Sequence, residues 1–436
     1  MGRVPGARLL SAMEQRFLHL GLTTRGGAGM AARRLHEALR SRGHASLMIV
    51  GDALPGEADV RAVQSGAARS RMFRAKVKSR LTSHRRFDFM NEAFANPDEA
   101  RIAALAADFR PTAIVASQLA YFLSFPAIAA MARQSKAAVI WFPMDMALLT
   151  GGCHYSWECG RYAEACGQCP ALRFGSGVND VTVRTLAAKK RALSGLRSGV
   201  VAASSQLLGQ VEGSALFGDT LSRIIPLSVD EQRFQPGDKA ALRRLWGLPD
   251  GRPVLFFGAR HMAHPRKGME VLEEALRRLP ALLGGSPLPA LLIAGDAGPF
   301  RGLAGEGYPI VETGLLGADR LPDAYAAADL FVSPSLEDSG PMMINEAVMS
   351  GVPIVSFPIG VAPDLVKDGV TGCLAAAMDA PALAEALAGV LLWPEARLAE
   401  ASAAARAFAL QSFTPGVAAD RYAAFARELG ERSPRA

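Results

Sequence analysis

Two carboxylates, Asp338 and Glu346, stand eight residues apart in the stretch PSLEDSGPMMINEAVMSG (334–351). A Gly-Pro turn between them leads into a helical pattern, so we expect Asp338 in a loop and Glu346 about one turn into a helix. The amides of a helix N-terminus bind anionic or hydroxyl-rich groups, and paired carboxylates accept sugar hydroxyls. The alternative is structural: Asp338 caps the helix and Glu346 pairs with a nearby side chain.

Cations cluster in a second stretch, FFGARHMAHPRKG (256–268), directly after an apolar run. If that run is a strand, its carboxyl end directs these cations towards a ligand site. A nucleoside diphosphate gains negative charge as its bond to a sugar breaks, and cations at this position would stabilise that charge. The alternative is an exposed basic loop. The candidates are Arg260, Arg266 and Lys267.

The stretch GGCHYSWECGRYAEACGQCP (151–170) holds four of the chain's five cysteines. A Cys-x-x-Cys redox pair would open a helix near a thioredoxin-like unit, and no such pattern is visible. Disulfides are rare in a reducing cytoplasm. Four thiolates suit a structural tetrahedral zinc, although this spacing is not a standard zinc-finger pattern. Packed, reduced thiols are the alternative. The candidate zinc ligands are Cys153, Cys159, Cys166 and Cys169.

Short apolar runs alternate with helical patterns along the chain, which predicts an α/β protein with parallel sheets covered by helices. The expected strands of the first half are 16–22, 45–52, 112–117, 137–142 and 199–204, the last closing the first sheet. The expected strands of the second half are 253–259, 289–296, 330–335 and 353–358. Two doubly wound halves place a ligand cleft between the carboxyl ends of their strands.

This pattern predicts two Rossmann-like domains joined near Pro226, which interrupts an apolar run. The last expected helix, 415–429, crosses back to the first domain. The expected segments are a flexible tail (1–15), an N-terminal domain (16–225) with the cysteine-rich insert (151–170), a C-terminal domain (226–414) and the returning helix (415–436).

A glycine-bearing turn, TTRGGAGM (23–30), follows the first expected strand. It is not the dinucleotide fingerprint Gly-x-Gly-x-x-Gly, which argues against a nicotinamide-dependent dehydrogenase. Gly26 and Gly27 would let the backbone approach a ligand's phosphates at this turn.

Positive charge is concentrated in residues 61–90, which carry nine Arg or Lys and one acid, Asp88. Phe73, Val77 and Leu81 recur every four residues there, so the segment 69–86 resembles a helix that docks on an anionic membrane surface. The alternative is a solvated helix whose stripe packs on its own domain. Nucleic acid is disfavoured, because no aromatic platform or binding motif accompanies the charge.

The sequence also bears on location. No apolar run approaches the roughly 20 residues needed to cross a bilayer, and the first fifteen residues lack the apolar core of a secretory signal. We expect a cytoplasmic protein, with peripheral contact to the inner face of the membrane through 69–86.

The stretch 334–357 resembles the acid-x7-acid motif of family 4 glycosyltransferases, which share the GT-B fold. The resemblance implies that Glu346 binds the donor ribose, while Asp338 and the amides near Gly340, Pro341, Met342 and Met343 hold the donor sugar. In the family a spaced Arg and Lys neutralise the diphosphate. Lys267 matches that lysine, and either Arg260 or Arg266 matches the arginine. Gly26 and Gly27 match a usual Gly-Gly turn.

Residues 141–172 are similar to a segment of one branch of these enzymes, which makes colanic acid and other exopolysaccharides. All four cysteines match, and so do Asp145 and His154. Asp145, Lys267 and Asp338 are thus implied as catalytic, and His154 as an acceptor-side residue. One departure is that Met144 stands where the branch has a histidine near the donor sugar.

The resemblance implies a retaining transferase that moves a sugar from a nucleotide-sugar donor to a glycan or lipid-linked acceptor. No catalytic metal or other cofactor is implied, since Arg and Lys replace it; zinc would be structural. Two rivals remain: a degenerate, non-catalytic glycan-binding or assembly subunit, which Met144 would permit, and a nucleotide-sugar epimerase of the same fold.

Overall fold

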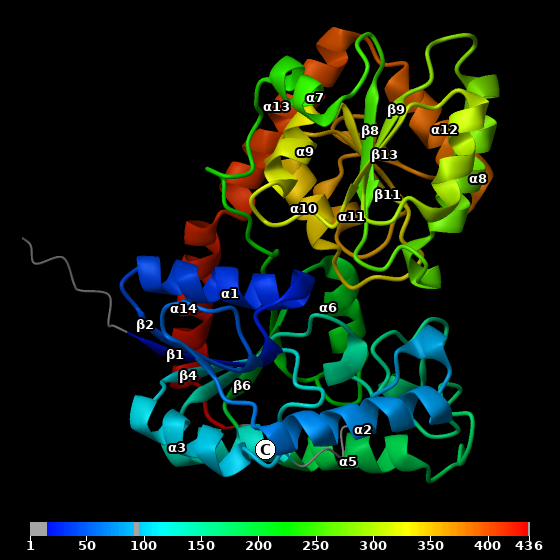
Figure 1. The fold of residues 1–436 in the computed structure, drawn as a ribbon. Coiled ribbons are helices and arrows are strands. Elements are labelled where there is room, and N and C mark those ends of the chain that lie inside the picture. Colours follow the sequence, from blue (N-terminus) through cyan, green and yellow to red (C-terminus); the bar gives the residue numbers. More distant parts are fainter. Residues whose placement is uncertain (1–14, 91–95, 435–436) are drawn as a thin grey trace, which may run out of the picture.

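The computed structural model describes residues 15–90 and 96–434, and the expected tail lies almost wholly outside them. Two parallel sheets, each flanked by helices, lie one above the other (Figure 1). We call the first sheet with its helices the N-terminal half and the second the C-terminal half.

The first sheet has seven strands in the order β3-β2-β1-β4-β5-β6-β7. In its register Leu20 lies between Ile49 and Ala116, and all three are buried. Such strands are buried on both faces and therefore read as continuous apolar runs. The strands are β1 (Arg16–Thr23), β2 (Ala45–Asp52), β3 (Val60–Ala62), β4 (Ala113–Ala116), β5 (Ala138–Trp141), β6 (Ser198–Ala202) and β7 (Leu221–Ile224).

The second sheet has six strands in the order β10-β9-β8-β11-β12-β13. Phe256 on the central strand pairs with Leu292 on one side and Phe331 on the other. The strands are β8 (Val254–Gly258), β9 (Ala290–Ala294), β10 (Ile310–Gly314), β11 (Leu330–Ser333), β12 (Ile354–Ser356) and β13 (Gly372–Leu374).

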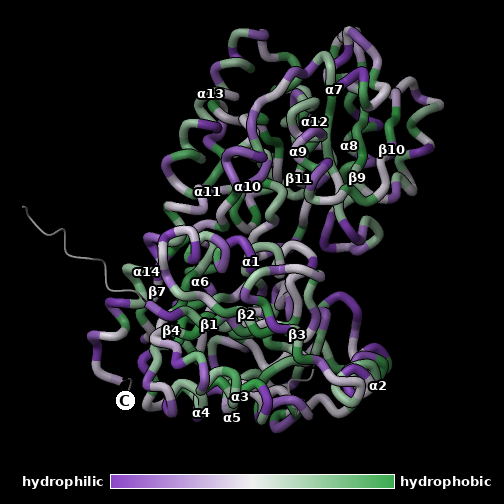
Figure 2. The backbone as a smooth tube through the Cα atoms, turned by 60° about the vertical axis from the view of Figure 1, so that its left-hand side comes forward, coloured by the Kyte–Doolittle hydropathy of each residue, from purple (hydrophilic) through white to green (hydrophobic). Residues whose placement is uncertain are grey.

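Helices cover both sheets, and Figure 2 shows hydrophobic colour concentrated along the strands. In the N-terminal half they are α1 (Gly26–Ser41), α2 (Gly66–Thr82), α3 (Glu99–Phe109), α4 (Phe125–Ser135), α5 (Val181–Leu193) and α6 (Ser205–Glu212). Those that follow are α7 (Lys239–Trp246), α8 (Met269–Leu282), α9 (Leu321–Ala327), α10 (Met342–Met349), α11 (Ala362–Leu365), α12 (Ala380–Leu391), α13 (Glu395–Ser412) and α14 (Pro415–Glu431). Short 3-10 turns are η1 (Arg85–Phe87), η2 (Met146–Leu148), η3 (Arg161–Ala163), η4 (Pro265–Lys267) and η5 (Gly298–Glu306).

The expectation that 199–204 closes the first sheet was wrong, because β7 pairs with β6 beyond it. The sequence patterns also missed β3, β10 and β13. All of these strands lie at sheet edges or are only three residues long, and edge strands lack the continuous apolar run that marks a buried strand. In β7, for example, Arg223 and Ile224 are exposed.

One hydrophobic cluster runs through both halves. It includes Phe17 and Tyr422 on one side, Phe256 on the other, and Leu227 and Phe234 of the segment between. Helix α14 packs on the first sheet, where the Tyr422 and Phe142 rings meet edge to face at 5.8 Å. The guanidinium of Arg406 on α13 donates to the carbonyls of Glu231, Phe234 and Met349, which fixes the connecting segment against the C-terminal half.

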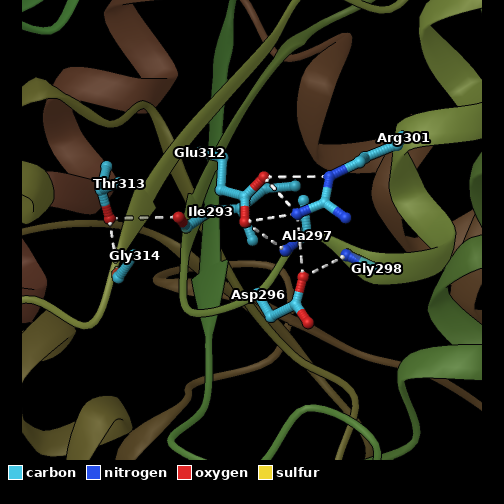
Figure 3. Close-up of polar contacts among 8 residues, drawn as sticks. All are labelled: Ile293, Asp296, Ala297, Gly298, Arg301, Glu312, Thr313 and Gly314. Carbon is cyan, nitrogen blue, oxygen red and sulfur yellow. Dashed lines mark hydrogen bonds and ion pairs between the residues drawn. The ribbon is translucent and has the colours of Figure 1, made fainter.

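The segment that follows β9 is tied to strand β10 at the edge of the second sheet. At β9 and β10, Arg301 pairs with Glu312 at 2.9 Å and with Asp296 at 3.0 Å, and the Ala297 amide donates to Glu312 (Figure 3). These charges are well exposed, so each pair contributes little to stability. Their effect is to order the segment after β9, on the side of the sheet that also carries the loops after β8 and β11.

Candidate functional site

The acidic loop after β11 and the cationic turn after β8 meet through Asp338. Its Oδ2 accepts from Lys267 Nζ at 2.6 Å and from Arg266 Nη1 at 2.8 Å. Burial raises the pKa of Asp338, but these two cations outweigh it and hold the pKa below its usual range. Asp338 is thus held by two cations, each of which could also form charged hydrogen bonds to an anionic ligand.

Backbone packing fixes this meeting. Gly268, which ends the turn η4, has φ +64°, and a Cβ there would lie 1.8 Å from the carbonyl oxygen of Pro334. Only glycine fits so close an approach. The Leu336 amide also donates to the Arg266 carbonyl at 2.8 Å. The two loops are thus held together independently of their charges.

Asp338 does not cap α10, which begins after Pro341 without a side-chain cap. Its Oδ1 instead accepts from the Gly340 amide at 3.2 Å, within its own loop. The capping alternative for Asp338 is therefore wrong.

Glu346 lies in the second turn of α10 and is 2 % exposed. Its Oε1 accepts from Arg34 Nη2 at 2.8 Å, and its Oε2 accepts from the Tyr325 hydroxyl at 3.3 Å. Burial raises its pKa, and Arg34 and the tyrosine only partly offset that effect. The structural alternative required a partner close to Glu346 in the sequence. Arg34 belongs to α1 and is therefore not such a partner.

The glycine turn faces the C-terminal half. Gly26 has φ +72°, and a Cβ there would lie 3.7 Å from Arg260 Nη1. Nothing lies within 4 Å of a Cβ at Gly27, so this turn is uncrowded. Arg260 thus stands at the start of α1, whereas Arg266 stands beside Lys267. The structure places both arginines where the halves meet and leaves open which one matches the family's arginine.

Asp145 and His154 form a pair beside the cationic turn. His154 Nδ1 lies 2.7 Å from Asp145 Oδ2, and Asp145 Oδ1 accepts from the Ala147 amide at the start of η2. Burial raises the pKa of Asp145, but the histidine and this amide outweigh it and lower the pKa. The neighbouring Tyr155 lies with its ring 4.4 Å from the Arg266 guanidinium carbon, so this segment reaches the C-terminal half.

Further contacts close the boundary between the halves around α6, α10 and α11, which Figure 1 shows near one another. The Gln206 side chain accepts from the Gly360 amide, and Asp364 accepts from the Ser205 amide at 2.7 Å. His264 Nε2 lies 3.3 Å from Asp88 Oδ2 on the far side of the cationic turn. The expected site residues therefore converge on one interface, where Asp338 and Glu346 are both covered.

The four clustered cysteines line one small cavity of about 20 Å³ with Gly151, Gly152 and Thr182, room for roughly one water molecule. Burial raises the pKa of Cys153 to about 12 and of Cys169 to about 11, so both are protonated thiols at neutral pH. Within residues 15–90 and 96–434, no three His, Cys, Asp or Glu side chains are placed to hold a metal ion. The zinc site expected from their spacing is therefore not supported.

Helix α2 carries its apolar stripe on the surface. Phe73 is 68 % exposed and Leu81 66 %, and together with Val77 they line a shallow hollow of about 310 Å³ with Arg74 and Lys78. The stripe therefore does not pack on its own half. Among the described residues, no helix is long and apolar enough to cross a membrane.

Comparison with solved structures defines the fold class as GT-B. The chain superposes on sucrose-phosphate synthase from Thermosynechococcus elongatus with a TM-score of 0.68, 19 % identity and coverage of 95 % of this chain and 99 % of that one. It also superposes on Anabaena HepE in complex with UDP-glucose with a TM-score of 0.64, 18 % identity and coverage of 95 % and 100 %.

In a sequence comparison, residues 252–392 of the C-terminal half match the family Glycosyl transferases group 1. D-inositol 3-phosphate glycosyltransferase of Nocardia farcinica is 33 % identical over 197 residues, 42 % of this chain and 43 % of the relative. GDP-mannose-dependent alpha-(1-6)-phosphatidylinositol monomannoside mannosyltransferase of Mycolicibacterium smegmatis is 34 % identical over 209 residues, 43 % and 52 % respectively. The chain thus spans about half the length of the curated relatives it matches.

Sequence reasoning missed several residues of this interface. Arg34 and Tyr325, which contact Glu346, lie in ordinary helical patterns, and no local signal separates them from surface or core positions. Asp88 and His264 meet only through the tertiary fold. Tyr155 was also missed, although it adjoins His154 in a motif already singled out and could have been found from that signal.

Proposed function

We propose that this protein is a retaining glycosyltransferase that moves a sugar from a nucleotide-sugar donor to a glycan or lipid-linked acceptor. The observation that carries the proposal is the convergence of Lys267, Arg266 and Asp338 at the boundary of two Rossmann-like halves, where Arg260 also lies beside Gly26. The GT-B fold and the match of residues 252–392 support it.

The chemistry follows from charge. The bond between the sugar's anomeric carbon and the donor phosphate oxygen breaks, and the leaving nucleoside diphosphate keeps the electron pair. A new bond forms to an acceptor oxygen, whose proton is released. Lys267 and an arginine stabilise the charge that develops on the diphosphate, and preorganised charges of this kind supply much of an enzyme's rate enhancement. In this scheme Asp338 holds the donor sugar and Glu346 the ribose, while Asp145 and His154 border the reacting sugar from the N-terminal half.

The acceptor class has several sources of support. The activities in the names of the relatives concern inositol phosphate and a phosphatidylinositol mannoside. The cysteine segment favours the exopolysaccharide branch. A lipid-linked acceptor agrees with the mannosyltransferase relative, and a surface glycan agrees with the exopolysaccharide branch.

Helix α2 fits a lipid-linked acceptor. It exposes an apolar stripe, and no acid lies within Gly66–Thr82, where six Arg or Lys residues do. A basic helix with exposed Phe and Leu binds anionic lipid surfaces through charge and apolar burial together. We infer that α2 brings the cytoplasmic protein to the inner face of a membrane.

A thermal-shift panel of UDP-, GDP- and ADP-sugars tests the donor assignment, followed by product analysis with glycan and lipid-linked acceptors. The expected result is stabilisation by one donor class and transfer of its sugar with retained anomeric configuration. A free epimerised sugar nucleotide would identify an epimerase instead. Binding without transfer or donor hydrolysis would identify a non-catalytic subunit.

A further inference from the structure

Helix α5 carries a lysine in the interior of the N-terminal half. Lys189 is 2 % exposed, and its ammonium donates to the carbonyls of Ala147 at 2.6 Å and Thr150 at 2.8 Å. Its Nζ also lies 5.0 Å from the centre of the Phe125 ring. A buried ammonium is unfavourable unless hydrogen bonds compensate it, and an apolar side chain would fill the same space without that penalty. The hydrogen bonds, rather than the volume of the side chain, therefore distinguish a lysine at this position.

The Ala147 end of this contact lies beside the Asp145–His154 pair. The Ala147 amide donates to Asp145 Oδ1 at 2.8 Å, while the Ala147 carbonyl accepts from Lys189. One residue earlier, the Met146 amide donates to the His154 carbonyl at 3.0 Å. The ammonium therefore holds a residue that contacts the carboxylate directly, and the adjacent residue contacts the backbone of the histidine.

The Thr150 end of the contact leads to the histidine along the chain. The Thr150 hydroxyl donates to the carbonyl of Cys153, the residue that precedes His154, at 2.7 Å. Lys189 thus holds both ends of the segment 147–150, one near each member of the pair.

Removing the ammonium would leave two buried carbonyls without this donor, which is costly for backbone groups away from water. The segment would then shift, and the 2.7 Å contact between His154 Nδ1 and Asp145 Oδ2 would shift with it. A misplacement of about 1 Å, caused by a change far from the reacting atoms, can lower a rate about 100-fold. A residue buried outside the site can therefore control the rate of reaction within it.

We propose that Lys189 is a positioning residue for sugar transfer, which holds the Asp145–His154 pair in place from the interior of the N-terminal half. The inference rests on the proposed function, in which this pair borders the reacting sugar. The carbonyls and the ring that Lys189 contacts lie within the N-terminal half, whereas the proposed donor contacts of Lys267 and Asp338 belong to the C-terminal half. Lys189 therefore acts on the rate of transfer and not on the affinity for the donor.

The variant Lys189→Met removes the ammonium and keeps a long apolar side chain in the interior. We expect its kcat for sugar transfer to fall about tenfold, because the pair is displaced, while its donor Kd stays within about twofold of the parent's. Lys189→Arg keeps a cation that can donate to both carbonyls and should recover most of the loss. Steady-state kinetics and donor titrations with the best nucleotide sugar of the panel measure both quantities.

A second variant separates positioning from a general structural role. Asp145→Asn removes the charged partner of His154. In that background Lys189→Met should change kcat by less than about twofold, since the pair that Lys189 holds is already disabled. A lysine with only a structural role would lower kcat by the same factor in both backgrounds, and that result would overturn the proposal.

Arg133→Met is the matched control, because Arg133 also donates to two carbonyls of the N-terminal half, those of Ala192 and Ser194 at the end of α5. It should leave kcat unchanged. Parent-like kcat in folded Lys189→Met, or a donor Kd that weakens as much as kcat falls, would also contradict the proposal. If Lys189→Met does not fold, Lys189→Gln takes its place, since it removes the charge and keeps one donor group.

Amide hydrogen exchange distinguishes failure of this inference from failure of the proposed function. If the parent neither transfers sugar nor hydrolyses a nucleotide sugar, the proposed function fails. Exchange at the amides of 146–150 then decides whether Lys189 holds the segment: faster exchange in Lys189→Met than in the parent is expected, and unchanged exchange would show that it does not.

Discussion

Lys267 and Asp338 show how a single charge can serve two purposes. In the unliganded protein the ammonium pairs with Asp338 at 2.6 Å, which keeps that buried carboxylate ionised. In the proposed function the same ammonium holds the phosphate oxygens of the donor. The site is therefore charged and ordered before any donor arrives, which is what electrostatic preorganisation requires.

Lys267→Met should lower kcat/KM for sugar transfer roughly 10- to 100-fold. A hydrogen bond to a charged group contributes about 1.5–3 kcal/mol, and each 1.4 kcal/mol is about tenfold in rate. Both kcat and donor affinity should fall, since the contact strengthens towards the transition state. Lys267→Arg keeps the charge in another shape and should recover part of the loss.

The control is Lys239→Met, because Lys239 is a half-exposed lysine paired with Asp329 in the same half. Steady-state kinetics with the best donor measure the effect. Parent-like transfer by Lys267→Met would show that the diphosphate is held by other residues.

At the scale of elements, strand β1 and helix α1 hold a buried pair of histidines. The turn between them also borders the candidate site. The rings of His19 on β1 and His36 on α1 meet edge to face at 5.6 Å. Burial, with the nearby charge of His36, holds the pKa of His19 well below 6.5, and burial also lowers the pKa of His36. The folded protein therefore keeps both rings neutral where the unfolded chain would take up protons.

The sign of the resulting pH dependence follows. Below about pH 6.5 these histidines bind protons in the unfolded state but stay neutral in the folded state. The free energy of unfolding therefore falls as the pH falls. His19→Leu removes one such group, and denaturant melts at about pH 7.5 and 5.5 should show a smaller loss than in the parent. His84→Gln, at an exposed position, should keep the parent's loss. If the free energy of unfolding of His19→Leu falls as much as that of the parent, groups other than His19 cause the acid sensitivity.

On the scale of the whole molecule, charge and apolar surface are unevenly placed. Helix α2 lies at the periphery of the N-terminal half, away from the C-terminal half (Figures 1 and 2). A membrane bound there would leave the C-terminal half free to move relative to the N-terminal half.

If α2 docks on membranes, the protein should sediment with vesicles rich in anionic lipid and dissociate as salt rises. The double variant Phe73→Ser and Leu81→Ser should bind several-fold more weakly, because it loses most of the exposed apolar area of the stripe. Leu392→Ser is the control, as Leu392 is 50 % exposed on the C-terminal half. If sedimentation with vesicles depends on neither lipid charge nor salt, the proposal that α2 docks on membranes is wrong.

The sequence alone determined the fold class and the residue types of the site. Central parallel strands are buried on both faces, so their apolar runs were recognisable, whereas β7, β10 and β13 at or near the edges were not. The Asp338–Glu346 spacing and the PRKG turn predicted which loops carry charge. The expected domain limits, including the boundary after residue 225, stay predictions.

Only the tertiary structure decided which side chains pair with each other at the candidate site. Arg34 reaches Glu346 across 312 residues, and no local pattern encodes a contact between residues so far apart in the sequence. The cysteines were expected to bind zinc, yet their side chains line a water-sized cavity without the placement that a metal ion needs. Sequence spacing specifies which residues share a loop, but the direction of each side chain depends on packing. Distances between side chains, and therefore ion pairs and metal sites, are set by that packing.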